Sequence, residues 1–304
     1  RALIDAARGG KEVTVVVELL ARFDEQANIN LAQQLEEAGA HVVYGVVGHK
    51  THAKMAMVVR KEGAKLKRYV HLGTGNYHAR TATLYTDFGL LTCNEQVCSD
   101  VNDVFMQLTG LGKASKLTQL WQSPFTLHAR LLDAIRNEVE AARAGKQAGI
   151  IAKMNSLLEP EIITALYFAS QAGVRVDLIV RGVCALRPGI PGVSENIHVR
   201  SIIGRFLEHH RVFHFVSSDA VYLASADWMD RNFFRRIEVC FPILDPVLKK
   251  RVVDESLRAA LADNVQAWVM KGDGRYRQAK TERQKPFPSQ LSLLELLSAK
   301  SGSA

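Results

Sequence analysis

The fold is decided by residues 149–182, which read GIIAKMNSLLEPEIITALYFASQAGVRVDLIVRG. An apolar run is followed by a turn, by a segment with helical apolar spacing that ends in Ala-Gly, and by a second apolar run. Such apolar runs are typical of strands buried on both faces, and a glycine suits the end of a helix. Two parallel strands joined by a helix are the basic α/β unit. The stretch therefore predicts an α/β fold.

The same order of elements occurs near the start of the chain. A strand-like run at 13–17 is followed by a helical segment that ends at Gly39 and by a second run at 42–47. The endings EEAGAHVVY and SQAGVRVDL occupy equivalent places in the two copies. The chain therefore contains an internal repeat.

Two domains are expected from this repeat, because 304 residues suffice for two domains of about 150. Turn-forming residues gather at 108–125, between the copies. We place the first domain at 1–119 and the second at 120–304, each with a mainly parallel mixed sheet flanked by helices. The chain starts without methionine and within a helix-like pattern, so we interpret it as a fragment whose first domain is truncated at its N-terminus.

Composition narrows the class of protein. With 47% hydrophobic and 23% charged residues, the chain resembles an ordinary soluble globular protein. No run of eighteen apolar residues is present, which predicts no transmembrane segment. Four cysteines without metal-type spacing favour a reducing cytosol. The net charge of +8 favours a polyanionic partner and leaves nucleic acid, phosphate polymer and anionic lipid open.

A short polar motif is duplicated as well. The first half has His52 and Lys54, two residues apart in THAKM, and the second half has His209 and Arg211 in EHHRVFHFV. Residues two apart on a strand point the same way, so each histidine is expected to share a face with a cation.

The repeat continues downstream of each motif, where residues 72–91 align without a gap on residues 223–242. The spacer before this block is six residues longer in the first copy, where RKEGAKLKR at 60–68 predicts an exposed basic hairpin. Chance would not be expected to repeat a histidine, a cation, a hydroxyl turn, an arginine and an acid in this order. The aligned pairs are Thr74 with Ser225, Asn76 with Asp227, Arg80 with Arg231, and Asp87 with Glu238.

A histidine beside a fixed cation suits a phosphate or a phosphodiester. The imidazole can attack phosphorus or transfer a proton, and the cation balances charge on the oxygens. The acid in each copy, Asp87 or Glu238, is expected to bind the second ring nitrogen of the histidine in the same copy. Thr74 and Ser225 are expected to donate to phosphate oxygens. If the halves pack about a pseudo-twofold axis, both histidines face one cleft, one as nucleophile and the other as general acid.

The remaining histidines lack a repeated partner. His210 points to the strand face opposite His209, and His214 falls outside the aligned pair, so both are interpreted as structural. Arg80 and Arg231 either line the cleft or only bridge to carboxylates within the fold.

At this point the sequence resembles a known family. The duplicated His-x-Lys units with a downstream GTGN resemble the phospholipase D superfamily, and longer strings resemble the C-terminal half of the large bacterial polyphosphate kinase family. The resemblance covers nearly the whole chain and implies two tandem phospholipase-D-like domains. The strings are KTHAKMAMVVR (50–60), YVHLGTGNYHARTATLYTDFGLLT (69–92), LIVRGVCALRPGIPG (178–192), RFLEHHRVFHF (205–215) and SADWMDRN (225–232).

The resemblance implies a phosphotransferase that moves the terminal phosphate of ATP reversibly onto polyphosphate through a phosphohistidine. It places the phosphohistidine at His52 and the second histidine at His209. It matches a phosphate-contacting tyrosine to Tyr85, a phosphate-binding arginine to Arg181, and an arginine associated with a magnesium site to Arg22. Because arginine has no lone pair for a metal, we expect Arg22 to clamp phosphates whose oxygens Mg²⁺ bridges.

Further implications concern partners and location. The resemblance implies ATP or ADP and polyphosphate as substrates, no nucleic-acid partner, a homo-oligomer of the full-length protein, and a cytoplasmic location, with peripheral association with the inner membrane face as an option. Domains that precede this segment in the family carry part of the adenine pocket, so the fragment alone is expected to be weak or inactive. The cations expected to line the cleft are Arg22, Lys54, Arg80, Arg181, Arg211 and Arg231.

Two alternatives remain open. A phospholipase-D-like phosphodiesterase or nuclease would use the same histidine pair on a diester, with water as the final acceptor. A non-catalytic module would only bind polyanions. In the kinase hypothesis His209 lies on the leaving-group side, and we expect it to be protonated in the resting state.

Overall fold

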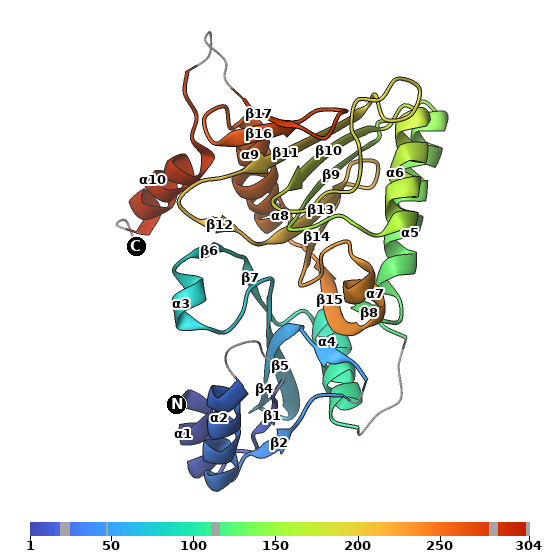
Figure 1. The fold of residues 1–304 in the computed structure, drawn as a ribbon. Coiled ribbons are helices and arrows are strands. Elements are labelled where there is room, and N and C mark those ends of the chain that lie inside the picture. Colours follow the sequence, from blue (N-terminus) through green and yellow to red (C-terminus); the bar gives the residue numbers. More distant parts are fainter. Residues whose placement is uncertain (19–24, 47, 111–115, 280–284, 302–304) are drawn as a thin grey trace.

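The computed structural model describes residues 1–18, 25–46, 48–110, 116–279 and 285–301. Figure 1 shows two parts of unequal size. The first third of the chain, in blue and cyan, lies below a large sheet that the rest of the chain builds.

A ten-stranded sheet dominates the larger part. Its order is β17-β16-β11-β10-β9-β13-β14-β15-β3, and β8 also pairs with β15. The strands β9, β10 and β11 pair in parallel, as the decisive stretch predicts. The strand bounds are β3 Lys50–Thr51, β8 Trp121–Ser123, β9 Gly149–Met154, β10 Arg175–Val180, β11 Ile197–Ile202, β13 Arg211–Phe215, β14 Ala220–Ala224, β15 Arg236–Pro242, β16 Ala267–Met270 and β17 Tyr276–Gln278.

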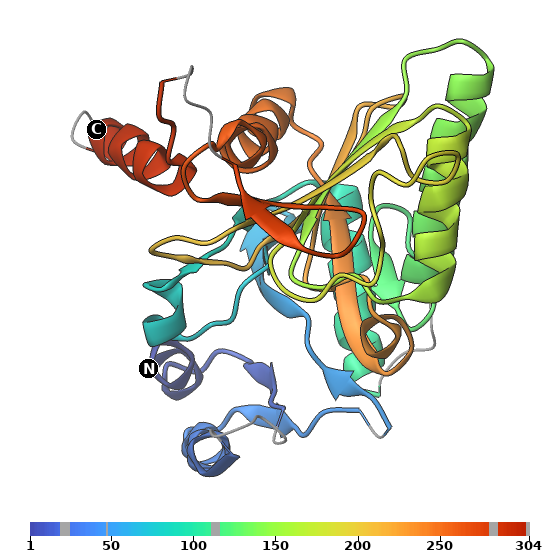
Figure 2. The same cartoon turned by 45° about the horizontal axis from the view of Figure 1, so that its top comes forward.

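Helices cover both faces of this sheet (Figure 2). Alternate residues of β9 point to opposite faces, as a strand requires. Ala152 joins the core beneath α5 and α6, whereas Ile151 packs against the core that contains η1. The helical bounds are α5 Leu127–Arg143, α6 Pro160–Gln171, α7 Asp230–Phe234, α8 Pro246–Val252, the π-helical η1 Val253–Arg258, α9 Ala259–Ala262 and α10 Ser289–Ser301.

Two of these helices begin in the same way, with an acidic N-cap followed by proline. The carboxylate of Glu159 accepts from the backbone of Glu161 and Ile162, and Asp245 does the same for α8. Proline is favoured at the first helical position because its missing N–H would be unsatisfied there anyway.

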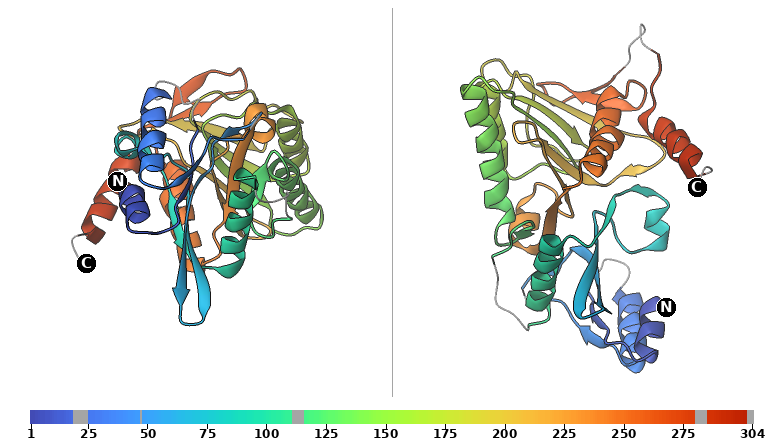
Figure 3. Two further views of the ribbon diagram at one scale, coloured as in Figure 1. Left: turned by 90° about the horizontal axis from the view of Figure 1, so that it is seen from below. Right: turned by 180° about the vertical axis from the view of Figure 1, so that it is seen from behind.

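The smaller part contains two small sheets. Strands β1 and β2 pair in parallel, and β4, β5 and β7 pair antiparallel. The predicted basic hairpin at 60–68 is confirmed as the end of β4 and the start of β5, which project from the body (Figure 3). The bounds are α1 Ala2–Arg8, β1 Thr14–Val16, α2 Glu25–Glu37, β2 His41–Val43, β4 Lys54–Glu62, β5 Lys65–Gly73, α3 Ala79–Ala82, β6 Tyr85–Thr86, β7 Gly89–Thr92 and α4 Glu95–Leu108.

The predicted α/β class with mixed sheets is confirmed, but most strand pairs are not parallel. Strand β4 turns directly into β5, and β13 turns directly into β14. Strands joined by such short turns must run antiparallel, because a parallel connection needs a crossover of a dozen residues or more.

Two short strand pairs join the halves of the repeat. Strand β3 pairs with β15, with Lys50 opposite Arg236, and β12 (Leu207–Glu208) pairs with β6, with Leu207 opposite Tyr85. In the internal alignment, Lys50 corresponds to Leu207 and Arg236 to Tyr85, so the two pairs are the same contact made twice. The strand that precedes the histidine of each half therefore pairs with a strand of the other half.

No helix in the described part of the chain is long and apolar enough to cross a membrane.

Candidate active site

His52 follows β3 and is held by an acid from the other half. Its Nδ1 lies 2.9 Å from a carboxylate oxygen of Glu238, which is completely buried. The hydroxyl of Ser225 donates to the same carboxylate at 2.5 Å, and Arg236 lies 3.7 Å from it. Nδ1 must therefore donate to Glu238, which leaves the lone pair on Nε2 for chemistry.

His209 follows β12 and has an equivalent environment. Its Nδ1 lies 2.9 Å from both carboxylate oxygens of Asp87, to which Thr74 donates at 2.6 Å. Nη1 of Arg211 lies 3.1 Å from Nε2. A side chain at position 75 would collide with Asp87, since a Cβ added to Gly75 would lie 2.2 Å from Oδ2. Gly75, the second glycine of GTGN, thus permits the close approach of Asp87.

The expected pairing of each acid with the histidine of its own copy is wrong. Glu238 binds His52 and Asp87 binds His209, because the strand before each histidine pairs with the two residues that directly precede the acid of the opposite half. The expected role of the hydroxyls also differs. Thr74 and Ser225 donate to the orienting acids, so their hydrogen atoms are not directed at phosphate oxygens.

The two histidines belong to one electrostatic site. The charge of Arg211 lowers the pKa of Lys54, and the charge of Asp87 raises it. The charge of Lys54 in turn lowers the pKa of His209. Arg211 also reaches the carbonyl of Thr74 across the halves, at 3.5 Å. The structure therefore brings both repeated motifs together, as a pseudo-twofold arrangement requires.

Tyr85 and Arg181 lie next to His209. The rings of Tyr85 and His209 are 5.0 Å apart between centroids. Arg181 follows β10 and donates through Nε to Asn155 at 2.7 Å, and the amide of Asn155 donates to the carbonyl of His209 at 3.0 Å. Asn155 thus connects Arg181, the predicted phosphate-binding arginine, with His209.

Sequence reasoning missed Asn155, Asp227 and Arg236. Asp227 is buried and holds Arg211 through two hydrogen bonds, at 2.8 and 3.2 Å, and it accepts from Asn155 as well. Asp227 had been aligned with Asn76, which is a signal that could have suggested a role. Asn155 ends an apolar strand without any motif, so the sequence offered no signal for it.

Two predicted cations are not brought to the histidines. Arg80 in α3 and Arg231 in α7 are exposed, and among the described residues neither is hydrogen-bonded to the histidines or their acids. Their role in binding phosphate stays a prediction. Arg22 lies outside the described residues, and so does the magnesium site predicted beside it.

Burial sets the protonation state of both histidines. Desolvation lowers the pKa of His52 and of His209, although Glu238 and Asp87 oppose the effect. A neutral His209 also fits the geometry, because Arg211 can only donate and so needs a lone pair on Nε2. The expectation that His209 is protonated in the resting state is therefore not supported.

The adjacent His210 is structural, as predicted. It is buried, its Nδ1 lies 3.2 Å from the carbonyl of Thr86, and its Nε2 lies 2.8 Å from the hydroxyl of Ser256. Burial lowers the pKa of His210 to about 3, so the ring stays neutral. His214 is also accounted for by the fold, because Nε2 lies 3.2 Å from Asp219.

Lys54 differs from the permanent cation expected from the sequence. Its side chain is 6% exposed, and Nζ donates to the carbonyl of His52. Burial lowers the pKa of Lys54 to about 7, and the charges of Arg211 and Arg236 add to this while Glu238 opposes it. Lys54 is therefore only partly charged near neutral pH, and an anion bound beside it would raise its charge.

Replacing Lys54 by methionine is expected to stabilise the fold at pH 7 by at least about 1 kcal/mol, even with one hydrogen bond lost. Between pH 7 and 10.5 the unfolded chain binds more protons at this lysine than the folded chain does. The wild type therefore gains stability from this group as pH rises through that window, and the advantage of the variant shrinks. Urea midpoints at pH 6–9 measure this, with the exposed Lys65→Met as control. An unchanged pH slope in Lys54→Met would contradict the assignment.

The fold and site define a duplicated α/β protein with two acid-paired histidines among basic side chains. Two family models match the chain: polyphosphate kinase C-terminal domain 1 over residues 1–114 and C-terminal domain 2 over residues 120–290. The chain belongs to the polyphosphate kinase family, as the resemblance predicted.

Individual proteins give the same result. The polyphosphate kinase of Burkholderia vietnamiensis is 67% identical over 282 residues, which is 91% of this chain and 41% of that protein. The polyphosphate kinase of Paraburkholderia phytofirmans is 65% identical over 303 residues, which is 96% of this chain and 43% of that protein. The chain thus spans about two fifths of the length of these curated relatives.

Two solved structures resemble the chain over its length. The crystal structure of polyphosphate kinase from Porphyromonas gingivalis gives a TM-score of 0.91 at 35% identity, with 100% of this chain and 46% of that chain covered. The phosphatidylserine synthase of Haemophilus influenzae gives 0.52 at 11% identity, with 99% and 91% covered, which concerns the fold alone.

Proposed function

We propose that the protein containing this chain is a polyphosphate kinase that transfers the terminal phosphate of ATP reversibly to polyphosphate through a phosphohistidine on His52. The observation that carries the proposal is the fixed orientation of His52. Buried Glu238 holds Nδ1 at 2.9 Å, so Nε2 is the nucleophile. Membership of the family supports the choice of substrates.

The neutral imidazole of His52 suits nucleophilic attack. Burial lowers its pKa, so the Nε2 lone pair is free at neutral pH. As the bond from Nε2 to the γ-phosphorus forms and the bond from that phosphorus to the bridging oxygen of ADP breaks, the ring becomes positive. Glu238 is placed to stabilise that charge, as the acid of a catalytic triad does for its histidine. Transfer to polyphosphate follows by attack of its terminal oxygen on the phosphohistidine.

Basic side chains offset the charge on the transferring phosphoryl group. Arg211 is held by Asp227 and Arg181 by Asn155, so neither guanidinium needs to reorganise when phosphate binds. Preorganised donors of this kind are the main source of rate enhancement in phosphoryl transfer. Lys54 gains its full charge as the anion binds, and Tyr85 is placed beside His209 to contact phosphate.

Replacing Arg181 by alanine is expected to cost about 2–4 kcal/mol of transition-state stabilisation, because it removes one preorganised donor. The measurement is kcat/KM for ATP in the full-length protein. Arg187→Ala, which removes an exposed arginine six residues further along the chain, serves as the control. An unchanged kcat/KM in Arg181→Ala would contradict its role.

Magnesium is implied by the family, and the described residues around the two histidines do not fit a resident magnesium ion. Mg²⁺ prefers free carboxylates and water. The carboxylates of the site are Asp87, Asp227 and Glu238, and each is already bound by a histidine or an arginine. We propose that the ion enters with the nucleotide as part of the substrate.

The domain boundary, the location, the oligomeric state and the partners of the protein are also proposals. A division at 119/120 is supported by the two matched ranges, 1–114 and 120–290. A cytoplasmic location rests on four cysteines that are all free. We also retain a homo-oligomer of the full-length protein, no nucleic-acid partner, and little or no activity of this segment alone.

The test is exposure of the full-length protein to γ-labelled ATP with Mg²⁺, followed by peptide mapping. We expect one acid-labile, base-stable phosphate on the peptide that contains His52. Label on another peptide would contradict His52 as the nucleophile. Release of a phosphate monoester from a diester without nucleotide would favour the phosphodiesterase alternative. Polyphosphate binding without any covalent label would favour a binding module.

A further inference from the structure

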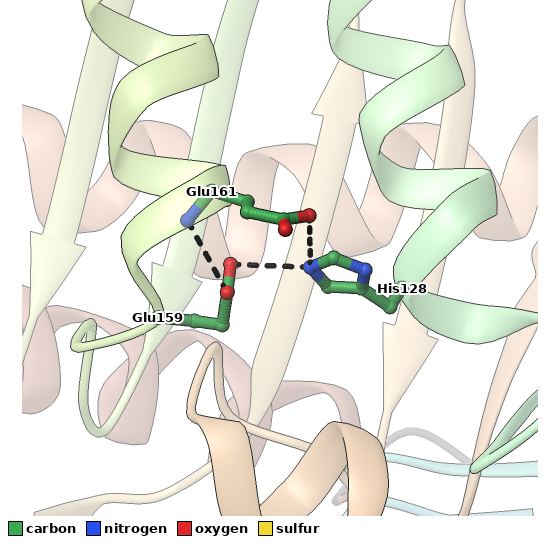
Figure 4. Close-up of side chains that lie close together, drawn as sticks. All are labelled: His128, Glu159 and Glu161. Carbon is green, nitrogen blue, oxygen red and sulfur yellow. Dashed lines mark hydrogen bonds and ion pairs between the residues drawn. The ribbon is translucent and has the colours of Figure 1, made fainter.

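A second cluster of chemically competent side chains lies on the helices that cover the large sheet. His128 is in the first turn of α5, and Glu159 and Glu161 are at the start of α6. Figure 4 shows the two carboxylates converging on the imidazole. Nε2 of His128 lies 3.2 Å from Glu159 and 3.8 Å from Glu161, and the three ligand atoms lie within 4.8 Å of one another.

The imidazole nitrogen at the centre of this cluster is buried. Nε2 of His128 is shielded from solvent, and among the described residues it has no hydrogen-bonded partner, although it lies 3.2 Å from the carboxylate of Glu159. A bound ion is one explanation of a buried polar atom of this kind in a native fold. The ring cannot turn away easily, because it packs against Phe233 and Phe234 at 5.1 and 5.0 Å between centroids.

The carboxylates of Glu159 and Glu161 have lone pairs available for a metal ion. Glu159 is 4% exposed, and it accepts from two backbone N–H groups as the N-cap of α6, which uses only part of the four lone-pair positions of a carboxylate. Within the described part of the chain, the carboxylate of Glu161 meets only His128, and its side chain is 71% exposed. Glu161 is therefore free to move the short distance that coordination requires.

We propose that His128, Glu159 and Glu161 form a binding site for a divalent transition-metal ion of the Zn²⁺ type. Bonds of 2.0–2.2 Å to a tetrahedral ion separate its ligand atoms by about 3.4 Å, and the two distances from Nε2 fall on either side of this value. One imidazole and two carboxylates suit Zn²⁺ better than Mg²⁺, which prefers oxygen. The exposed side at Glu161 gives the ion an entry path and room for a water ligand.

The metal would link the outer helices to the loop that enters the candidate active site. Residues 155–159 run from Asn155, which contacts Arg181, to Glu159. The backbone N–H of Glu159 donates to the carbonyl of Trp228, the residue after Asp227. An ion held between α5 and α6 would therefore fix the Glu159 end of this loop, which is a structural role away from the transferring phosphate.

The alternative is a simple ion pair between a protonated His128 and the two glutamates. An ion pair needs no metal, and removal of either partner would change stability without creating or abolishing metal affinity. The two interpretations are separated by measuring metal binding and not activity, so the outcome is independent of the proposed kinase function.

The experiment is titration of the metal-stripped full-length protein with Zn²⁺, by calorimetry and by thermal unfolding. We expect one saturable equivalent that raises the unfolding temperature, with no such effect of Mg²⁺. His128→Gln and Glu161→Gln should each lower the Zn²⁺ affinity of this site at least about tenfold. Glu161→Gln is the safer variant for folding, because the side chain is exposed.

The matched control is His198→Gln, since His198 is an exposed histidine 3.5 Å from the carboxylate of Asp177. The His198→Gln variant should bind Zn²⁺ with the affinity of the wild type. Absence of a saturable equivalent in the wild type would overturn the proposal, and so would equal Zn²⁺ affinity in His128→Gln and His198→Gln.

Discussion

Replacing His52 by alanine is expected to abolish phosphate labelling from ATP in the full-length protein, the largest effect of any single substitution. In the proposed mechanism, Nε2 of this histidine forms the bond to phosphorus. His209 has its Nε2 beside Arg211 at 3.1 Å, which occupies the lone pair that attack would need. The measurement is acid-labile label per protein molecule after a single exposure to ATP.

Two comparisons make this result specific. His198→Ala removes an exposed histidine outside the site and should label normally, and circular dichroism should show that His52→Ala keeps its fold. Glu238→Gln should also label poorly, because the nucleophile loses the acid that fixes its tautomer. Label that persists in His52→Ala would refute the assignment of the nucleophile.

The crossed acids add a test that the sequence could not supply. Removal of Glu238 should shift the limb of the pH–rate profile that reports His52, and Asp87→Asn should shift the limb that reports His209. The opposite pattern would show that the pairing of acids and histidines differs in solution.

The sequence predicted the α/β class and identified His52 and His209 as candidate site residues, because duplication made both visible. A single His-His pair such as His209 and His210 could not be divided into functional and structural members. The copy at His52 decided the question, and the burial of His210 against Ser256 agrees with it.

The sequence did not predict which acid binds which histidine, because an internal alignment identifies equivalent residues and does not identify contacts. The exchange of β3 and β12 between halves is a property of tertiary packing. The charge state of Lys54 was also inaccessible, since it depends on burial. Asn155 was missed because a lone asparagine after an apolar strand usually begins a turn.

Replacing His209 by alanine is expected to slow formation of the phosphohistidine without abolishing it, by roughly 10²–10⁴-fold. An in-line transfer needs a nucleophile on one side of the phosphorus and a leaving oxygen on the other. With His52 as the nucleophile, we place His209 near the bridging oxygen of the nucleotide as a proton donor or charge stabiliser. Some rate should remain, because ADP bound to magnesium is a tolerable leaving group.

The pH dependence of labelling separates these two roles of His209. Burial lowers its pKa in the free protein, so the proton must be acquired when anionic phosphates bind and raise that pKa. The rate in the wild type should then fall as pH rises through the pKa of His209 in the complex, and His209→Ala should lack this fall. His209→Gln keeps a hydrogen-bond donor and cannot transfer a proton, so recovery of part of the rate would indicate hydrogen bonding to the leaving oxygen. Single-turnover labelling of His52 across pH measures all three proteins. If His209→Ala labels at the wild-type rate at every pH, His209 does not act on the leaving group, and its pairing with Asp87 must serve another step, such as holding the polyphosphate acceptor.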